Sequence, residues 1–336
     1  MKALQIPQPR RIQLTDLPDC PPPGSGEILL QLHYVGFCGS DLNTWRGRNA
    51  MAKPAVIPGH EIGAVIAAVG PDVPEHFRPG QVVTANPYTN CGHCASCRAG
   101  RYNACEHNET LGVQRDGAMR EFLVLPWQKV IPAEGISVRD AALIEPMSVG
   151  FHAVERAGVR DNDTVLVIGC GMVGLGAVVR SLRRGATVIA ADIDPDKLAL
   201  ARELGAAYTY NTNQPWSGLP APSVVIEAVG SPATYRLAIE QAQFCGRVAC
   251  IGYAKSDVEL PTGLIVKKEL DVRGSRNATP SDFEAVIRCI PGLDRHLLEQ
   301  FISGIVRPEE AQAALERWDA DPGKVFRILT QWNTEH

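Results

Sequence analysis

Residues 163–174, Asp-Thr-Val-Leu-Val-Ile-Gly-Cys-Gly-Met-Val-Gly, form the stretch that decides the fold of this chain. The apolar run that ends at Ile168 is typical of a buried strand, and the residues from Leu175 to Arg183 predict a helix. Between them the glycines follow the pattern G-x-G-x-x-G. A strand, this glycine turn and a helix in that order are the context that dinucleotide binding requires.

Each residue of the turn has a physical task in such a site. Gly169 permits the tight turn, Gly171 lets the backbone approach a pyrophosphate, and Gly174 lets the helix pack against the strand. Met172 and Val173 belong to the same loop, and the N-terminus of the helix that follows faces the phosphates with its unpaired N–H groups. A lone glycine motif can also be a coincidental turn, so the neighbouring elements matter.

An acidic residue stands where the ribose would lie. Asp192 ends a second predicted strand, residues 186–191, and follows Gly174 by 18 residues. That spacing suits a carboxylate that accepts from the ribose 2′-hydroxyl of NAD. No basic residue occurs between Asp192 and Lys197, so a 2′-phosphate would meet negative charge, and NAD is favoured over NADP.

The alternation of strands and helices continues beyond this pair. Further predicted elements are a helix at 194–204, a strand at 223–227, a helix at 232–244 and strands at 246–252 and 270–274. This order predicts a doubly wound parallel sheet and an α/β fold class. Residues 1–90 differ, because short strands at 27–35, 61–69 and 81–84 alternate with Pro and Gly. They predict a second, β-rich and partly barrel-like unit.

Length and composition set limits on the class of protein. The 336 residues are enough for two domains. A net charge of −4 and a pI near 6.1 argue against a nucleic-acid or anionic-membrane surface. Residues 1–7 lack the apolar core of a signal peptide, and the longest apolar stretch, 165–179, contains four glycines. We therefore expect a cytoplasmic protein with no nucleic-acid or membrane partner.

Four of the ten cysteines are clustered, with the spacing C-x2-C-x2-C-x7-C at Cys91, Cys94, Cys97 and Cys105. Closely spaced thiolates of this kind can bind one tetrahedral zinc with no open position, which predicts a structural site. An iron–sulfur cluster would require a shorter last gap and a following Pro. Free buried thiols are the other alternative. His93 and His107 lie nearby, and we interpret both as loop histidines.

A second candidate metal site is dispersed along the chain. Gly59-His60-Glu61 follows a Pro-containing turn, with Cys38 upstream and Glu145 downstream. Widely spaced nitrogen, sulfur and oxygen donors suit a catalytic zinc, which keeps one position free for water or substrate. The alternative is a buried thiol beside an ordinary His–Glu pair, and spacing alone does not reject it.

Taken together, these motifs resemble the zinc-dependent medium-chain dehydrogenases over essentially the whole chain. Residues 36–41, 59–61, the four-cysteine lobe and the glycine loop occur in the order of that family. The segment 145–153 resembles the polyol (sorbitol) dehydrogenase branch, since Glu145 stands where alcohol dehydrogenases have a second cysteine ligand. Residues 274–283 are similar to bacterial sugar-acid dehydrogenases of the L-galactonate dehydrogenase type.

The resemblance implies the domain plan and the assembly. A GroES-like catalytic domain would comprise residues 1–148 and 277–336, with a structural zinc lobe at about 86–110, around a Rossmann domain at 149–276. It also implies two zinc ions per chain, one catalytic and one structural, NAD as cofactor, and a homodimer or homotetramer. The implied reaction transfers a hydride from a secondary alcohol of a sugar acid or polyol to NAD⁺.

Site roles follow from the resemblance. Cys38 and His60 would bind the catalytic zinc together with a carboxylate, Glu61 or Glu145, and Ser40 would take the proton of the substrate. Asp41 would orient a ligand histidine. Asn43 replaces a histidine that in many relatives ends a proton relay.

The substrate contacts are the least specified. The candidates are Trp45, Met119, Arg276 and Asn277. Arg276 suits a carboxylate because its guanidinium forms a bidentate fork, although a structural ion pair is the alternative. Trp45 could equally be a packing residue, and Met119 replaces a pocket-lining Phe of relatives. Two other functions are a catalytically silent, cofactor-binding regulator on this fold, and a dehydrogenase for a simple alcohol or an amino-acid alcohol.

Overall fold

The computed structural model describes residues 1–53, 55–254 and 256–333. The chain forms two compact units. Unit 1 comprises Met1–Glu145, Val286–Leu293 and the chain from Phe301 on, and unit 2 comprises Pro146–Ala285 and Asp294–Gln300. The functional domain borders predicted at residues 148 and 277 stay a prediction, because compactness alone assigns no function.

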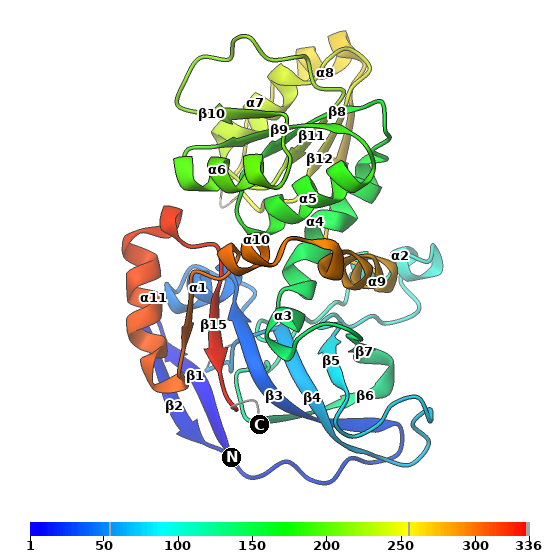
Figure 1. The fold of residues 1–336 in the computed structure, drawn as a ribbon, viewed down its shortest axis with the longest axis vertical. Helices are drawn as coiled ribbons and strands as arrows, with labels where there is room; N and C mark the ends of the chain where they lie inside the picture. Colours follow the sequence, from blue (N-terminus) through cyan, green and yellow to red (C-terminus); the bar gives the residue numbers. More distant parts are fainter. Residues whose placement is uncertain (54, 255, 334–336) are drawn as a thin grey trace. The chain divides into compact units, whose positions relative to one another are not determined.

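Unit 2 is built on six parallel strands in the order β10-β9-β8-β11-β12-β13. Figure 1 shows α5 and α6 on one face of this sheet and α7 and α8 on the other. The strands are β8 (Thr164–Ile168), β9 (Thr187–Asp192), β10 (Tyr208–Asn211), β11 (Val224–Glu227), β12 (Arg247–Cys250) and β13 (Asp271–Gly274). The helices are α5 (Met172–Arg183), α6 (Pro195–Glu203), α7 (Pro232–Gln241), α8 (Thr262–Lys268) and α10 (Arg295–Gln300). The predicted doubly wound parallel sheet is confirmed.

The pattern of burial explains why these residues form this sheet. All four residues of β8 after Thr164 are buried, as expected of a central parallel strand covered on both faces. The sequence prediction missed β10 and made the helix of α7 three residues too long, since α7 ends at Gln241. The strand β10 is short and polar, and its pairing with β9 rather than its own pattern defines it.

Unit 1 contains a seven-stranded sheet in the order β14-β15-β3-β4-β5-β7, with β6 paired to β3. Its strands are β3 (Glu27–Phe37), β4 (Glu61–Val69), β5 (Val82–Ala85), β6 (Phe122–Pro126), β7 (Val130–Pro132), β14 (Gly304–Val306) and β15 (Ile328–Gln331). The long antiparallel pair β3–β4 contains two register shifts, which bend strands. The predicted β-rich unit is therefore confirmed, and its fold includes a strand from the C-terminal end of the chain.

Short helices complete unit 1. They are α1 (Gly39–Trp45), α2 (Ala95–Arg98), α3 (Val138–Ala141), α11 (Ala311–Ala320) and the 3-10 turns η1 (Tyr102–Ala104), η2 (Trp127–Lys129), η3 (Ile290–Gly292), η4 (Pro308–Glu310) and η5 (Pro322–Lys324). Two helices run from one unit into the other, α4 (Ile144–Ala157) and α9 (Pro280–Cys289). The helix α4 was not predicted from the sequence.

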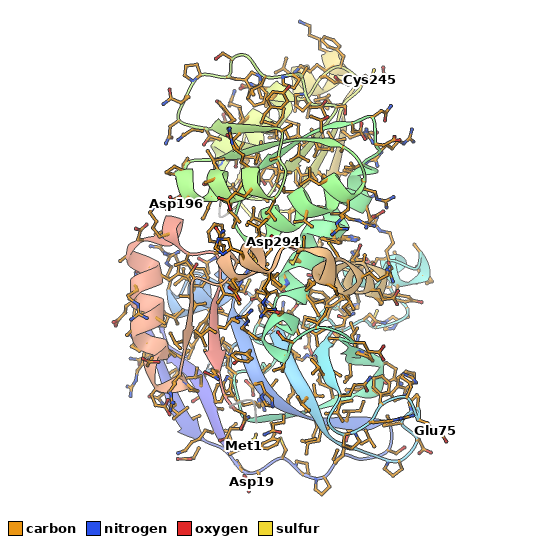
Figure 2. All side chains as sticks on the ribbon, viewed as in Figure 1. Met1, Asp19, Glu75, Asp196, Cys245 and Asp294 are labelled. Carbon is orange, nitrogen blue, oxygen red and sulfur yellow. The ribbon has the colours of Figure 1, made fainter. Side chains whose placement is uncertain are left out.

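A two-stranded antiparallel ribbon, β1 (Lys2–Gln8) and β2 (Arg11–Asp16), opens unit 1. The terminal ammonium group of Met1 donates a hydrogen bond to Asp19 Oδ1 at 2.7 Å, and both residues lie at the same edge in Figure 2. The buried residues Leu4, Ile12 and Leu315 join this ribbon and α11 to the core of unit 1.

Within the described part of the chain, we find no helix whose length and apolar character would let it cross a bilayer.

Candidate active site and metal centres

The first donor, Cys38, lies at the junction between β3 and α1. Cys38 is the residue that precedes α1, and its backbone N–H donates to Asp41 Oδ2 at 2.8 Å. The other oxygen of this buried carboxylate accepts from the backbone N–H of Gly59 at 3.3 Å. Asp41 therefore ties together the two turns that carry Cys38 and His60. The sequence analysis expected Asp41 to orient a histidine, and the structure shows it bonded to the backbone next to that histidine.

His60 and Glu61 stand where a turn becomes the strand β4. Gly59 has a φ of +97°, and a Cβ there would lie 2.7 Å from Met119 Cγ and 2.8 Å from Val35 Cγ1. A side chain at this position would be strained and would clash, so the turn requires glycine. It places both the imidazole and the carboxylate in the interior, with His60 5% exposed and Glu61 fully buried.

These elements bring three donors together. One ligand atom each from Cys38, His60 and Glu61 lies within 4.8 Å of the other two. His60 Nδ1 and Glu61 Oε1 are buried and have no hydrogen-bond partner within the described residues. Buried polar atoms are nearly always satisfied, so these two atoms point to a bound group that accepts lone pairs. A zinc ion fits the donor set of thiolate, imidazole and carboxylate.

Burial and charge shift the pKa values of this cluster in opposite directions. Burial raises the pKa of Cys38, but the hydrogen bond and charge of His60, together with the charge of Arg327, outweigh burial and lower it to about 7. Burial raises the pKa of Glu61 well above its ordinary value, although Arg327 opposes that rise. A cation beside Glu61 favours its charged form, as Arg327 does and as a bound zinc would.

Arg327, which the sequence analysis missed, lies behind Glu61. Its Nε is 3.1 Å from Glu61 Oε2, and its guanidinium also donates to the carbonyl oxygen of Phe37. The side chain is buried, at 4% exposure. The available signal was a charged residue within the apolar run before β15, since such a residue is seldom buried unless it is paired.

Glu145 lies outside the group of three donors and contacts a second missed residue, Tyr88. Its hydroxyl donates a hydrogen bond to Glu145 Oε1 in the buried interior. Burial, and next the charge of Glu145, raise the pKa of Tyr88 well above its ordinary value, so the phenol stays protonated and remains a donor. Glu145 is still close enough to influence the pKa values of His60 and Glu61. No sequence pattern marked Tyr88, which lies three residues before Cys91.

The four clustered cysteines converge on one point. Their sulfur atoms lie within 4.8 Å of one another, and Cys94 Sγ is 3.8 Å from Cys105 Sγ. A tetrahedral zinc with bonds of about 2.3 Å separates its sulfur ligands by about 3.8 Å. Backbone N–H groups of Cys91 and His107 each donate to Cys105 Sγ at 3.3 Å. All four cysteines are free thiols, and their arrangement fits a closed tetrathiolate zinc site.

The glycine loop of unit 2 has the shape that a dinucleotide requires. A Cβ on Gly174 would lie 1.7 Å from the carbonyl oxygen of Gly169, so only glycine lets α5 pack this close to β8. A Cβ on Gly171 would meet no atom within 4 Å, which leaves open space beside the loop. Met172 and Val173 open α5 next to that space.

Asp192 lies at the end of β9, directly beside this loop. Its Oδ2 accepts a hydrogen bond from the backbone N–H of Cys170 at 2.7 Å, and its Oδ1 accepts from Asp194 N at 3.0 Å. These bonds fix the carboxylate next to the residues that would hold a pyrophosphate. The loop and the acid thus have a geometry that suits an adenosine ribose and its phosphates, and that these residues bind them stays a prediction.

The remaining predicted site residues are dispersed. Trp45 is 2% exposed and packs in the core of unit 1, with Nε1 3.4 Å from Gln312 Oε1. Met119 is fully buried beside Gly59. Arg276 and Asn277 are half-buried in the β13–α9 loop of unit 2. Trp45 and Met119 thus lie in the core, and Arg276 and Asn277 lie in a loop. Contact of any of the four with substrate stays a prediction.

Comparison with known proteins gives the family. Residues 24–135 match the family model described as an alcohol dehydrogenase GroES-like domain, and residues 173–291 match the model described as a zinc-binding dehydrogenase. The chain is 34% identical to L-galactonate-5-dehydrogenase of Escherichia coli K12 over 80% of its own length and 82% of that protein. It is 31% identical to a sorbitol dehydrogenase of Bacillus subtilis over 94% and 93%.

The fold agrees with these matches. Galactitol-1-phosphate dehydrogenase from Escherichia coli superposes with a TM-score of 0.88 at 29% identity, covering 98% of this chain and all of that one. An Escherichia coli CFT073 protein described as a short chain alcohol dehydrogenase (rspB), solved with NADH, gives a TM-score of 0.89 at 29% identity over 98% and 99%. The chain therefore belongs to the zinc-dependent medium-chain alcohol dehydrogenases, in their polyol and sugar-acid branch.

Proposed function

We propose that this protein oxidises a secondary alcohol of a sugar acid or a polyol to the ketone, with NAD⁺ as acceptor. The observation that carries the proposal is the cluster of Cys38, His60 and Glu61, whose ligand atoms lie within 4.8 Å of one another. His60 Nδ1 and Glu61 Oε1 in this cluster are buried without a hydrogen-bond partner in the described chain. The names of the similar proteins, L-galactonate-5-dehydrogenase and sorbitol dehydrogenase, support the substrate class.

The three donors would hold the catalytic zinc, and the glycine loop with Asp192 would hold NAD⁺. Zinc in such a site lowers the pKa of a substrate hydroxyl, and NAD⁺ accepts the hydride. Glu61 is placed with the thiolate and the imidazole, whereas Glu145 is engaged by Tyr88. We therefore assign Glu61 as the resting ligand and Glu145 as a nearby carboxylate that can exchange with it.

Ser40 is the group that receives the substrate proton in this proposal. It follows Cys38 by two residues, in the first turn of α1, and its hydroxyl oxygen is buried with no partner among the described residues. Such an oxygen can accept a hydrogen bond from a substrate hydroxyl. The side chain of Asn43, one turn further, does not titrate, so the proton passes from Ser40 to water rather than through a histidine relay.

The polar end of the substrate is assigned to the β13–α9 loop. Arg276 supplies a fork-shaped pair of donors that matches a carboxylate, and Asn277 supplies an amide for a hydroxyl. Asn277 has a φ of +56°, a conformation that costs a non-glycine residue energy. The location in the cytoplasm and a homodimeric or homotetrameric assembly belong to the same proposal.

The test measures NADH formation with aldonates, alditols and simple aliphatic alcohols, each with and without a zinc chelator. We expect turnover of aldonates or alditols that the chelator abolishes. Brisk turnover of simple alcohols alone would contradict the substrate class.

Arg276→Ala separates the two substrate classes. Because the guanidinium fork binds a carboxylate, the change should raise KM for an aldonate at least about tenfold, with a smaller effect on a neutral alditol. Steady-state kinetics on both substrates measure the difference. Equal changes for the two would remove the carboxylate role of Arg276.

A further inference from the structure

Two histidines of the four-cysteine lobe have no task in either metal site described above. His93 and His107 are exposed, and their rings are inclined by 30° with centroids 5.9 Å apart. One nitrogen of each ring and Cys91 Sγ all lie within 4.8 Å of one another. Two imidazoles and a thiolate are a ligand set that zinc and cobalt(II) accept. The sequence analysis interpreted both residues as ordinary loop histidines.

The ring of His93 is already oriented as a ligand would be. Its Nδ1 lies 2.9 Å from the carbonyl oxygen of Cys91, and a protonated Nδ1 that donates there leaves the Nε2 lone pair free. Metal-bound histidines usually donate their second ring nitrogen in this way, which fixes the tautomer and the ring plane. The guanidinium of Arg98 donates to the carbonyl oxygen of His93 and steadies the same turn.

Cys91 belongs to both ligand groups, and it is also the most accessible of the four cysteines. It is half-buried, whereas Cys94, Cys97 and Cys105 are 6%, 3% and 0% exposed. An ion that arrives from solvent therefore meets Cys91 and the two exposed imidazoles before it meets the other three thiols.

We propose that Cys91, His93 and His107 form an exposed acquisition site for a divalent ion of the zinc type, through which the four-cysteine site is loaded and emptied. The ion first binds the two imidazoles and the Cys91 thiolate. It then exchanges both metal–nitrogen bonds and its bound water for metal–sulfur bonds to Cys94, Cys97 and Cys105. Each of these thiols releases its proton to water, and no group changes oxidation state.

The experiment follows metal loading rather than turnover. Full-length protein is stripped with a chelator and mixed with cobalt(II), and the sulfur-to-cobalt charge-transfer absorption is recorded with time. This band reports mainly the site with four thiolates. In the double variant His93→Ala/His107→Ala, loading should be about tenfold slower, which corresponds to a barrier higher by about 1.4 kcal/mol. The final metal content should remain two ions per chain.

Matched variants and the reverse reaction complete the design. His76→Ala removes an exposed histidine outside the lobe and should load at the wild-type rate. Since loading and release share one route, removal of zinc by a chelator should slow by the same factor in the double variant. The single variant His107→Gln should show an intermediate rate.

Two results would overturn the proposal. Loading of the double variant at the rate of the His76→Ala control would mean that the histidines lie off the route. A final content of only one ion per chain would mean that they are needed to retain the structural ion itself. Neither result bears on whether the protein is a sugar-acid or polyol dehydrogenase, because no measurement in this experiment uses turnover.

Discussion

The four-cysteine lobe and the Cys38–His60–Glu61 cluster are two metal centres of one unit, built in opposite ways. The lobe takes all its ligands from residues 91–105, so local spacing and turn geometry suffice to form it. The other cluster takes Cys38 from the start of α1 and His60 with Glu61 from the start of β4, and Arg327 from before β15 supports it. A site assembled by distant strands depends on the whole fold.

The chemistry of the two centres differs in the same sense. Four thiolates surround an ion completely and supply more negative charge than a dication carries. One thiolate, one imidazole and one carboxylate only balance that charge and leave a position open. Glu61 is also shared with Arg327, at 3.1 Å, which weakens it as a ligand. The dispersed centre therefore leaves its ion Lewis-acidic and open to a substrate oxygen. The four-cysteine centre neutralises its ion and closes it off from substrate.

The largest expected effect comes from His60→Ala. Loss of a ligand at the open centre should lower kcat/KM at least about a thousandfold, because the metal supplies several kcal/mol of transition-state stabilisation. Metal analysis should find one zinc per chain instead of two, with the thermal midpoint nearly unchanged. Retention of both zinc ions and of activity would contradict the assignment of His60.

Cys97→Ser tests the opposite centre. Loss of one of four thiolates from a closed site should cost about 3 kcal/mol of stability and lower the thermal midpoint by about 10 °C. The kcat/KM of Cys97→Ser should fall far less than that of His60→Ala, because a loosened lobe affects the catalytic centre only indirectly. Calorimetry and NADH formation on the same preparation measure both effects. An unchanged thermal midpoint together with lost activity would mean that the four-cysteine site is the catalytic one, which contradicts the assignment.

Tyr88→Phe examines the link between the two centres. Tyr88 lies on the segment that leads into the lobe, where Leu111 N donates to the carbonyl oxygen of Pro87 at 3.1 Å. Removal of its hydroxyl leaves the buried Glu145 without this donor, a loss that typically costs about 1–3 kcal/mol of stability. Because the carboxylate is then held less firmly in position, kcat/KM should fall about tenfold. Tyr102→Phe, at an exposed tyrosine of the same lobe, is the matched control. Equal activity of the two variants would remove Tyr88 from the site.

The smallest expected effect is a shift on the pH axis. In chelator-treated protein, alkylation of Cys38 should reach half its maximal rate near pH 7, since its pKa is lowered to about 7. His60 contributes to this lowering, so His60→Ala should move the midpoint upward, toward that of ordinary thiols near 8.5. Mass spectrometry of the Cys38 peptide at a series of pH values measures the midpoint. A midpoint that stays in place would show that His60 does not set the pKa of this thiol.

The fold was largely predictable where a residue pattern and a local element coincide. The apolar run before Gly169 and the spacing of its three glycines placed β8, α5 and β9 to within three residues. The strand β10 was missed because it is a polar segment of four residues, in which Tyr208 is exposed and Tyr210 is buried. Only its neighbour β9 makes that segment a strand.

The residues of the candidate site likewise differ in how well the sequence predicted them. The donors Cys38, His60 and Glu61 occur in recognisable short motifs, so the sequence identified them as candidates. Tyr88 and Arg327 are single residues whose partners are distant in the chain, Glu145 and Glu61 respectively. Their function arises only when the strands pair, and no local pattern records it. The same holds for the choice between Glu61 and Glu145, which depends on which carboxylate Tyr88 engages.

The most direct test is a crystal structure of the zinc-loaded protein with anomalous scattering measured at the zinc absorption edge. We expect two peaks per chain. One should be bonded to the sulfur atoms of Cys91, Cys94, Cys97 and Cys105. The other should be bonded to Cys38, His60 and a carboxylate, with a water or a substrate oxygen as its last ligand. A peak at the four cysteines alone, with no metal at Cys38 and His60, would contradict the assignment of these two residues as ligands of the catalytic zinc.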